Sequence, residues 1–333
     1  MFKVIAKIVR AVIPAVRDQA RRLLRHPAPH GEAMPVAPWR RLWAGLAPNT
    51  RGACWILVGA LSLVLMHAVS KSMGKRYDPL QMTFFRCAIS LAFVFPIAIS
   101  GGLARLRTRH LKMHVVRALF GLLAWLAAFY AVSRLSLADF TTMSFTMPLF
   151  ITLLAVPVLG ERGSWQRWLA TLVGFVGVVV TARPGGEFQL ATLVALASAF
   201  AGACVLMVVK KTPMSEAPAA MLFYSNLILT VVLLLPALAV WRHPDLFDLL
   251  LLALIGFFGI VAQVSYIFGM REGDASALAP FDYVRLIYAG LLGFVLFAEV
   301  PDLWSLLGAA CIIGSTFYIG SHEDQLAREV SVR

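Results

Sequence analysis

Long apolar runs alternate with short polar segments along most of this chain. Ten such runs, each about 20 residues long, match the length that a helix needs to cross a bilayer. They cover approximately residues 52–73, 79–100, 114–133, 138–159, 165–182, 189–209, 217–240, 248–270, 275–297 and 302–320. Because a backbone in lipid must satisfy its own hydrogen bonds, each run is predicted to be an α-helix. The pattern therefore predicts an all-α membrane protein with ten transmembrane helices.

Composition supports this class. The chain is 60% hydrophobic and only 14% charged, whereas about a quarter of the residues in a soluble domain are charged. This excludes an ordinary soluble enzyme, because so few charges cannot cover its surface. Residues that end helices separate the apolar runs, as at Tyr77-Asp78-Pro79 and His243-Pro244-Asp245. The loops are too short to hold an external domain.

The positive charges are distributed unevenly between the two sides. With the N-terminus inside, 21 of the 30 Lys and Arg residues fall on the inner side and 5 on the outer side. The positive-inside rule therefore predicts that both termini are cytoplasmic. The net charge of +13 is thus attributed to topology and to contact with the lipid bilayer, and no nucleic-acid partner is expected.

The two ends of the chain are predicted to be tails. Residues 1–50 form a basic cytoplasmic tail, and residues 322–333 form a shorter one. Within the first tail, residues 1–26 place apolar side chains on one helical face and basic ones on the other. They fit either an amphipathic helix at the lipid surface or a loosely ordered basic tail.

The ten spans contain an internal repeat. Superimposing residue 120 on residue 258 aligns Phe120-Gly121 with Phe258-Gly259 and, at the same offset, Glu161 with Glu299. The offset equates spans 3, 4 and 5 with spans 8, 9 and 10, which predicts five-helix repeats over residues 51–185 and 186–321. Since five is odd, the second repeat must enter the membrane from the opposite side. Two inverted repeats with a substrate site between them are typical of secondary transporters.

Motifs within these spans resemble a known family. They are Leu137-Ala-Asp-Phe-Thr-Thr-Met-Ser-Phe-Thr-Met-Pro-Leu-Phe150, Leu159-Gly-Glu-Arg162, Gly174-Phe-Val-Gly-Val-Val-Val180 and Arg183-Pro184. This pattern is similar to the EamA-type family of the drug/metabolite transporter superfamily. The second half, Ala279-Pro-Phe-Asp-Tyr-Val-Arg285 through Phe297-Ala-Glu-Val-Pro-Asp302, resembles the branch with riboflavin and S-adenosylmethionine importers. One departure is Val300, which follows Glu299 where Arg162 follows Glu161.

The resemblance implies a secondary active transporter in the bacterial inner membrane. We expect it to move a small organic solute by alternating access, with riboflavin or a related cofactor or metabolite as the first substrate to test. An exporter of amino acids or drugs is the alternative, and a lipid-modifying membrane enzyme or a channel is the alternative from another class. The sequence has no clustered catalytic motif, so we expect no catalytic residue, no metal and no cofactor.

The strongest candidate for substrate binding is a charged pair inside span 9. A charge at mid-bilayer costs about 2.5–3.5 kcal/mol on insertion scales, so it requires a reason. Arg285 lies near the middle of the span, and Asp282 lies three residues earlier on the same helical face, within pairing reach. Arg285 is predicted to bind an anionic or carbonyl group of the substrate, with Asp282 and Tyr288 beside it. A purely structural pair is the alternative.

Further polar and aromatic side chains within the spans are candidates for the same site. They are Arg86, His67, Trp125, Gln263 and Tyr266. The repeat places Trp125 and Gln263 at matching positions, and aromatic faces with polar tips suit a flat or cationic organic solute. Arg86 fits a cavity contact, a structural pair, or a side chain that snorkels to the outer interface.

Two further predictions concern energy coupling and assembly. The candidate proton-coupling residues are Asp282, Glu161, Glu299 and His67. Small residues in spans 5 and 10 allow close helix approach, and a homodimer through these spans is possible.

Overall fold

The computed structural model describes residues 46–100, 110–159, 165–182, 190–211, 218–273 and 275–332, together with Thr108. In these ranges every regular element is a helix, as predicted. The helices are α3 (Pro48–Met73), α4 (Pro79–Ser100), α5 (Leu111–Val132), α6 (Leu137–Ser144), α7 (Met147–Leu159), α8 (Trp165–Thr181), α9 (Leu190–Lys211), α10 (Pro218–Ala239), α11 (Leu246–Glu272), α12 (Ala275–Asp282), α13 (Val284–Phe297) and α14 (Leu303–Val332). The amphipathic helix predicted over residues 1–26 lies outside the described residues.

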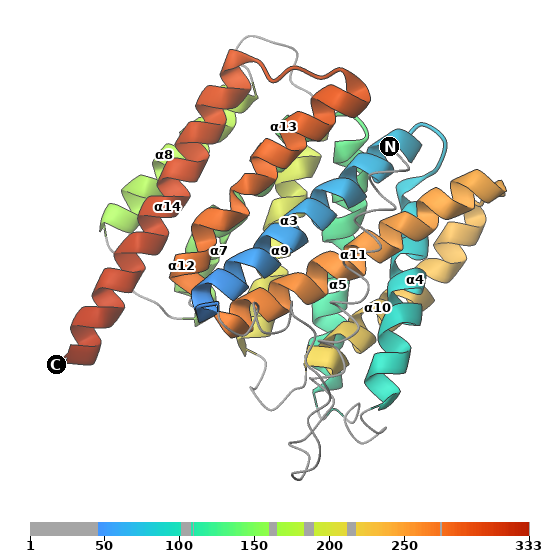
Figure 1. Ribbon diagram of the computed structural model, residues 1–333, viewed down its shortest axis with the longest axis horizontal. Coiled ribbons are helices and arrows are strands. Elements are labelled where there is room, and N and C mark those ends of the chain that lie inside the picture. The colour runs from blue at the N-terminus through green and yellow to red at the C-terminus, as the bar shows by residue number, and fades with distance from the viewer. Residues whose placement is uncertain are drawn as a thin grey trace.

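These helices agree closely with the predicted spans. In the described part of the chain, eight segments are long and apolar enough to cross a membrane, and the apolar helices Trp168–Thr181 and Leu303–Ile319 are shorter. The helix α14 continues to Val332, well past the predicted end of the last apolar run. In Figure 1, α3 begins and α14 ends on the same, lower side of the bundle.

Spans 4 and 9 are each broken into two helices at equivalent positions. The first break is at Phe145 and Thr146, whose amides bond to carbonyls three residues back. Pro148, at the start of α7, cannot bond to the carbonyl of residue 144 and would clash with it. The second break is at Tyr283, which is equivalent to Phe145 at the offset of the repeat. The rings of Phe145 and Tyr283 contact each other, with 5.3 Å between their centroids.

The main helix pairings map onto one another when the two halves are exchanged. The most extensive contacts join α3 to α11, α8 to α14, and α5 to α9. The helices α3 and α11 are spans 1 and 8, and α9 and α5 are spans 6 and 3, so exchanging the halves converts one pairing into the other. The helices α8 and α14 are spans 5 and 10, and their pairing is unchanged by the exchange. Figure 1 shows α8 and α14 side by side at one edge, with α3 and α11 crossing the middle.

Glycines set the closest helix approaches. A Cβ atom on Gly308 of α14 would lie 2.6 Å from the carbonyl oxygen of Gly177 in α8. A Cβ atom on Gly269 of α11 would lie 3.2 Å from the carbonyl oxygen of Gly52 in α3. The small residues of spans 5 and 10 therefore pack against each other within one chain. The homodimer stays a prediction.

Candidate functional site

The charged pair expected in span 9 is present where that span breaks. Asp282 ends α12 and Arg285 lies in the first turn of α13, with 2.8 Å between Asp282 Oδ2 and Arg285 Nη2. The guanidinium carbon of Arg285 lies 4.6 Å from the centre of the Phe145 ring. The pair thus contacts the break in span 4 as well as its own. Arg285 Nε is buried and has no hydrogen-bond partner among the described residues.

A tyrosine from the neighbouring helix completes this pair. Tyr266 on α11 donates its hydroxyl proton to Asp282 Oδ1, so both oxygens of this carboxylate are engaged. The ring of Tyr266 packs over Gly59 of α3, where a Cβ atom would lie 3.1 Å from ring carbon Cδ2. The sequence identified Tyr266 as a candidate but did not predict its bond to Asp282.

Arg86 of α4 is the most deeply buried charged side chain of the candidate set, with 1% of its surface exposed. Its guanidinium carbon lies 3.6 Å from the centre of the Trp125 ring of α5. Its Nη1 contacts Cys87 Sγ at 3.7 Å. Its Nε and Nη2 have no hydrogen-bond partner in the described part of the chain. In this structure Arg86 therefore neither reaches the protein surface nor pairs with a carboxylate of the described residues, and its role stays a prediction.

Two more candidates have unpartnered polar atoms. His67 of α3 is buried and packs edge-on against Phe140, with 4.8 Å between ring centroids, and it lies within electrostatic range of both Arg86 and Arg285. Neither His67 Nε2 nor Gln263 Oε1 has a hydrogen-bond partner among the residues described. Tyr288 of α13 is half-buried and packs against the apolar core cluster that contains Phe140.

The candidate coupling residue Glu299 belongs to a separate cluster at the end of α13. Its Oε1 lies 2.5 Å from Lys71 Nζ at the end of α3, and its Oε2 accepts a hydrogen bond from the Leu137 amide at 2.8 Å. Lys71 also donates to the Leu135 carbonyl. The carboxylate therefore joins α3, α13 and the N-terminus of α6, where negative charge is favourable. Glu161, the equivalent candidate in the first half, lies outside the described residues.

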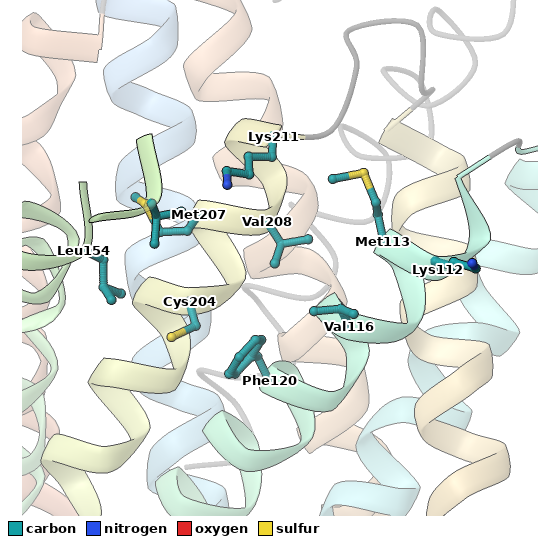
Figure 2. A pocket seen from close by; sticks show the side chains of 10 residues that line it. Lys112, Met113, Val116, Phe120, Leu154, Cys204, Met207, Val208 and Lys211 are labelled. Atoms are coloured by element: carbon teal, nitrogen blue, oxygen red, sulfur yellow. The ribbon is translucent and has the colours of Figure 1, made fainter. Parts of the chain in front are cut away.

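An apolar pocket opens elsewhere in the bundle, among α5, α7 and α9. Its volume is about 460 Å³, and its lining includes Phe120, Leu154, Cys204, Lys112 and Lys211. Figure 2 shows the two lysines on opposite sides of this pocket. Lys112 lies in the first turn of α5 and Lys211 ends α9, so the lysines mark the polar end of the pocket. No sequence signal identified this pocket, because its lining is ordinary apolar helix surface.

Taken together, the buried polar groups suit recognition of a solute. They comprise two guanidinium groups, one engaged carboxylate, one imidazole, an amide oxygen and three aromatic rings. Among the described residues, no group of three or more His, Cys, Asp or Glu side chains is placed to hold a metal ion. Cation–π and hydrogen-bonding groups of this kind bind and orient a ligand.

Comparison with known proteins gives matches over most of the chain. The sequence profile of the EamA-like transporter family matches residues 50–183 and again residues 189–321. An S-adenosylmethionine uptake transporter of Rickettsia bellii is 34% identical over 80% of this chain and 92% of its own length. A riboflavin transporter of Vibrio cholerae is 30% identical over 84% of this chain and 95% of its own length. A solved crystal structure that shares 20% identity covers 83% of this chain and 98% of its own, with a TM-score of 0.55. This last likeness shows the fold alone.

Proposed function

Because the chain belongs to the EamA-like transporter family, we propose that it is a secondary active transporter that imports a small organic metabolite by alternating access. The family and the names of the relatives point to a multi-pass membrane transporter of small metabolites. S-adenosylmethionine and riboflavin, which the relatives' names specify, are the substrates to test first. The proposed location is the bacterial inner membrane, with both termini in the cytoplasm.

The proposed architecture is ten spans in two inverted repeats, over residues 51–185 and 186–321. Three observations support it. The family profile matches the chain twice, the helix pairings map onto one another when the halves are exchanged, and spans 4 and 9 break at equivalent positions of the repeat, Phe145 and Tyr283. Broken helices at the interface of inverted repeats are typical of transporters.

The observation that carries the proposed site is the set of buried and partly buried polar side chains contributed by both halves. The first half supplies His67, Arg86 and Trp125, and the second supplies Gln263, Tyr266, Asp282, Arg285 and Tyr288. Buried ionisable groups in a membrane protein mark a solute pathway by default, because their burial is costly. A site shared between the halves is also where rocking of one half against the other would change access.

Two features support an assignment of the conformation. At the end of the bundle where α3 ends, the ion pair between Lys71 and Glu299 joins α3 to α13. At the opposite end, the pocket of about 460 Å³ opens between α5, α7 and α9. We assign the closed end to the outside and the pocket to the cytoplasmic vestibule. The proposed coupling residues stay Asp282, Glu161, Glu299 and His67. Of these, Glu299 pairs with Lys71 and Asp282 pairs with Arg285.

Uptake by proteoliposomes that contain the purified protein tests this function. We expect saturable uptake and counterflow of labelled S-adenosylmethionine or riboflavin, and loss of uptake in Arg285→Gln. The matched control is Arg51→Gln, because Arg51 also pairs with a carboxylate, Glu272 at 3.0 Å, but lies at the start of α3. Equal uptake by Arg285→Gln and Arg51→Gln would refute the site. Non-saturable flux would indicate a channel, and chemical change of the solute would indicate an enzyme.

A further inference from the structure

The buried guanidinium of Arg86 presents one complete edge without a protein partner. The Nε and Nη2 N–H groups lie on the same edge of a guanidinium and point in nearly the same direction. Both atoms are buried and have no hydrogen-bond partner among the described residues. Nη1, which belongs to the other edge, contacts Cys87 Sγ. The ring of Trp125 stacks on one face of the guanidinium, so Nε and Nη2 together form an edge that no described residue hydrogen-bonds.

The positive charge of Arg86 is not neutralised by any described residue. No carboxylate of the described residues lies within ion-pair distance of its guanidinium, whereas Arg285 is paired with Asp282 at 2.8 Å. Gly259 of α11 packs beside this group, and a Cβ atom built there would lie 3.3 Å from Nε and 3.2 Å from Met66 Sδ. Any side chain at position 259 would therefore crowd Nε, and glycine avoids this. One helical turn further along α11, the unpartnered Oε1 of Gln263 offers a hydrogen-bond acceptor.

From this geometry we infer that Arg86 is the carboxylate-binding residue of the transport site, and that the substrate is a carboxylate-bearing solute. Two parallel N–H groups on one guanidinium edge match the two oxygens of a carboxylate. The charges agree, since Arg86 and Arg285 together exceed Asp282 by one positive charge. An anionic group is therefore favoured beside Arg86, and an N–H donor next to a bound carboxylate would satisfy Gln263. An α-amino acid head group has both features.

This inference rests on the proposed transport function and narrows its substrate. S-adenosylmethionine carries an α-carboxylate beside an ammonium group, whereas riboflavin carries no carboxylate. Arg86 therefore favours the former over the latter. The sequence suggested Arg285 as the anion-binding residue. In this proposal Arg285 instead orients Asp282, because its charge is already paired with that carboxylate.

The test compares ligands that differ only in the carboxylate. Binding of S-adenosylmethionine and of decarboxylated S-adenosylmethionine to the purified protein is measured by calorimetry, with methionine and riboflavin alongside. The wild-type protein should prefer S-adenosylmethionine by at least about tenfold, since charge-assisted hydrogen bonds contribute that much. Arg86→Gln should bind the two forms within about twofold of each other. Gly259→Ala, which keeps the charge but crowds Nε, should also reduce the preference.

Stability measurements separate this role from a structural one. Because Arg86 has no acidic partner among the described residues, Arg86→Gln should unfold at a temperature no lower than the wild type. The matched control is Arg117→Gln in α5, which loses a bond to the Met221 carbonyl and should keep the tenfold preference. An Arg86→Gln protein that fails to fold would overturn the inference.

The ligand results separate failure of the inference from failure of the function. Wild-type protein that binds both forms equally, or that binds and transports riboflavin alone, refutes the role of Arg86 and leaves the transporter intact. Protein that takes up none of these solutes into proteoliposomes refutes both.

Discussion

Replacement of Gly308 by alanine should disrupt the contact between α8 and α14. A Cβ atom at position 308 would overlap Thr181 Oγ1, and it would lie 2.6 Å from the Gly177 carbonyl oxygen and 2.8 Å from the Thr181 amide nitrogen. The last two atoms belong to the backbone, so a side-chain rotation cannot relieve the clash. The two helices must separate instead, and close packing along their shared face is lost.

The expected magnitude follows from a comparison with Gly314 on the same helix. No atom lies within 4 Å of a Cβ atom built there, so Gly314→Ala changes only helix propensity, which favours alanine by about 1 kcal/mol. Gly308→Ala has the same propensity gain but adds an overpacking cost of about 3 kcal/mol, the upper end for an insertion into a packed interior. The difference in the free energy of unfolding between the two variants isolates the packing cost.

Unfolding of the purified protein in mixed micelles, titrated with sodium dodecyl sulfate and followed by tryptophan fluorescence, measures this difference. Adding Thr181→Ala to Gly308→Ala should restore only part of the loss, because the two backbone contacts remain. Equal stability of Gly308→Ala and Gly314→Ala would refute the reasoning, since it would mean that α8 and α14 are not in contact as described.

Three further predictions concern the end of the bundle where α3 ends. Lys71→Met and Glu299→Gln should each lower the free energy of unfolding by about 1–3 kcal/mol, because each leaves a partly buried partner unpaired, and the double variant should lose less than the sum. Ala298→Gly should raise the free energy of unfolding by about 1 kcal/mol, because Ala298 has a φ of 54°, a conformation that glycine adopts without strain. An unchanged unfolding midpoint would contradict this. Burial and the bond to Asp248 raise the pKa of Tyr77 to about 12 from 10. The contribution of the protonated hydroxyl to the stability of the fold is therefore complete below pH 10 and is lost as the pH rises through 12. Tyr77→Phe should therefore show a smaller alkaline loss of thermal stability between pH 10 and 12, and identical pH profiles would refute this.

The helices could be predicted from local pattern because the bilayer imposes a length and a polarity on each span. The break in span 4 was also foreseeable, since Pro148 cannot continue the hydrogen bonding of the preceding turn. The break at Tyr283 was not, because the nearest proline, Pro280, lies within α12 and before the break. Only the repeat offset from Phe145 could have identified it.

Ion pairs between residues close in sequence could be predicted, whereas those between distant segments could not. Asp282 and Arg285 were expected to pair because three residues on a helix bring side chains together, and they do. Lys71 and Glu299 also pair, but they lie in opposite halves of the sequence. Their contact depends on how the two halves dock, which single-helix periodicity does not encode. The bond from Tyr266 to Asp282 was missed for the same reason.

The charges inside the spans therefore fall into two kinds, which differ in their effect on stability. Arg285 and Lys71 each have a carboxylate partner, and removing that partner would leave a buried charge uncompensated. Arg86 has no such partner in the described part of the chain, so its burial already destabilises the fold, and stacking on Trp125 offsets only part of that cost. A membrane protein retains such a group when a ligand supplies the missing contacts. The sequence could identify Arg86 as costly to bury, but only the arrangement of the helices around it shows that the described residues leave Nε and Nη2 without partners. That observation is the basis for proposing a solute at this group.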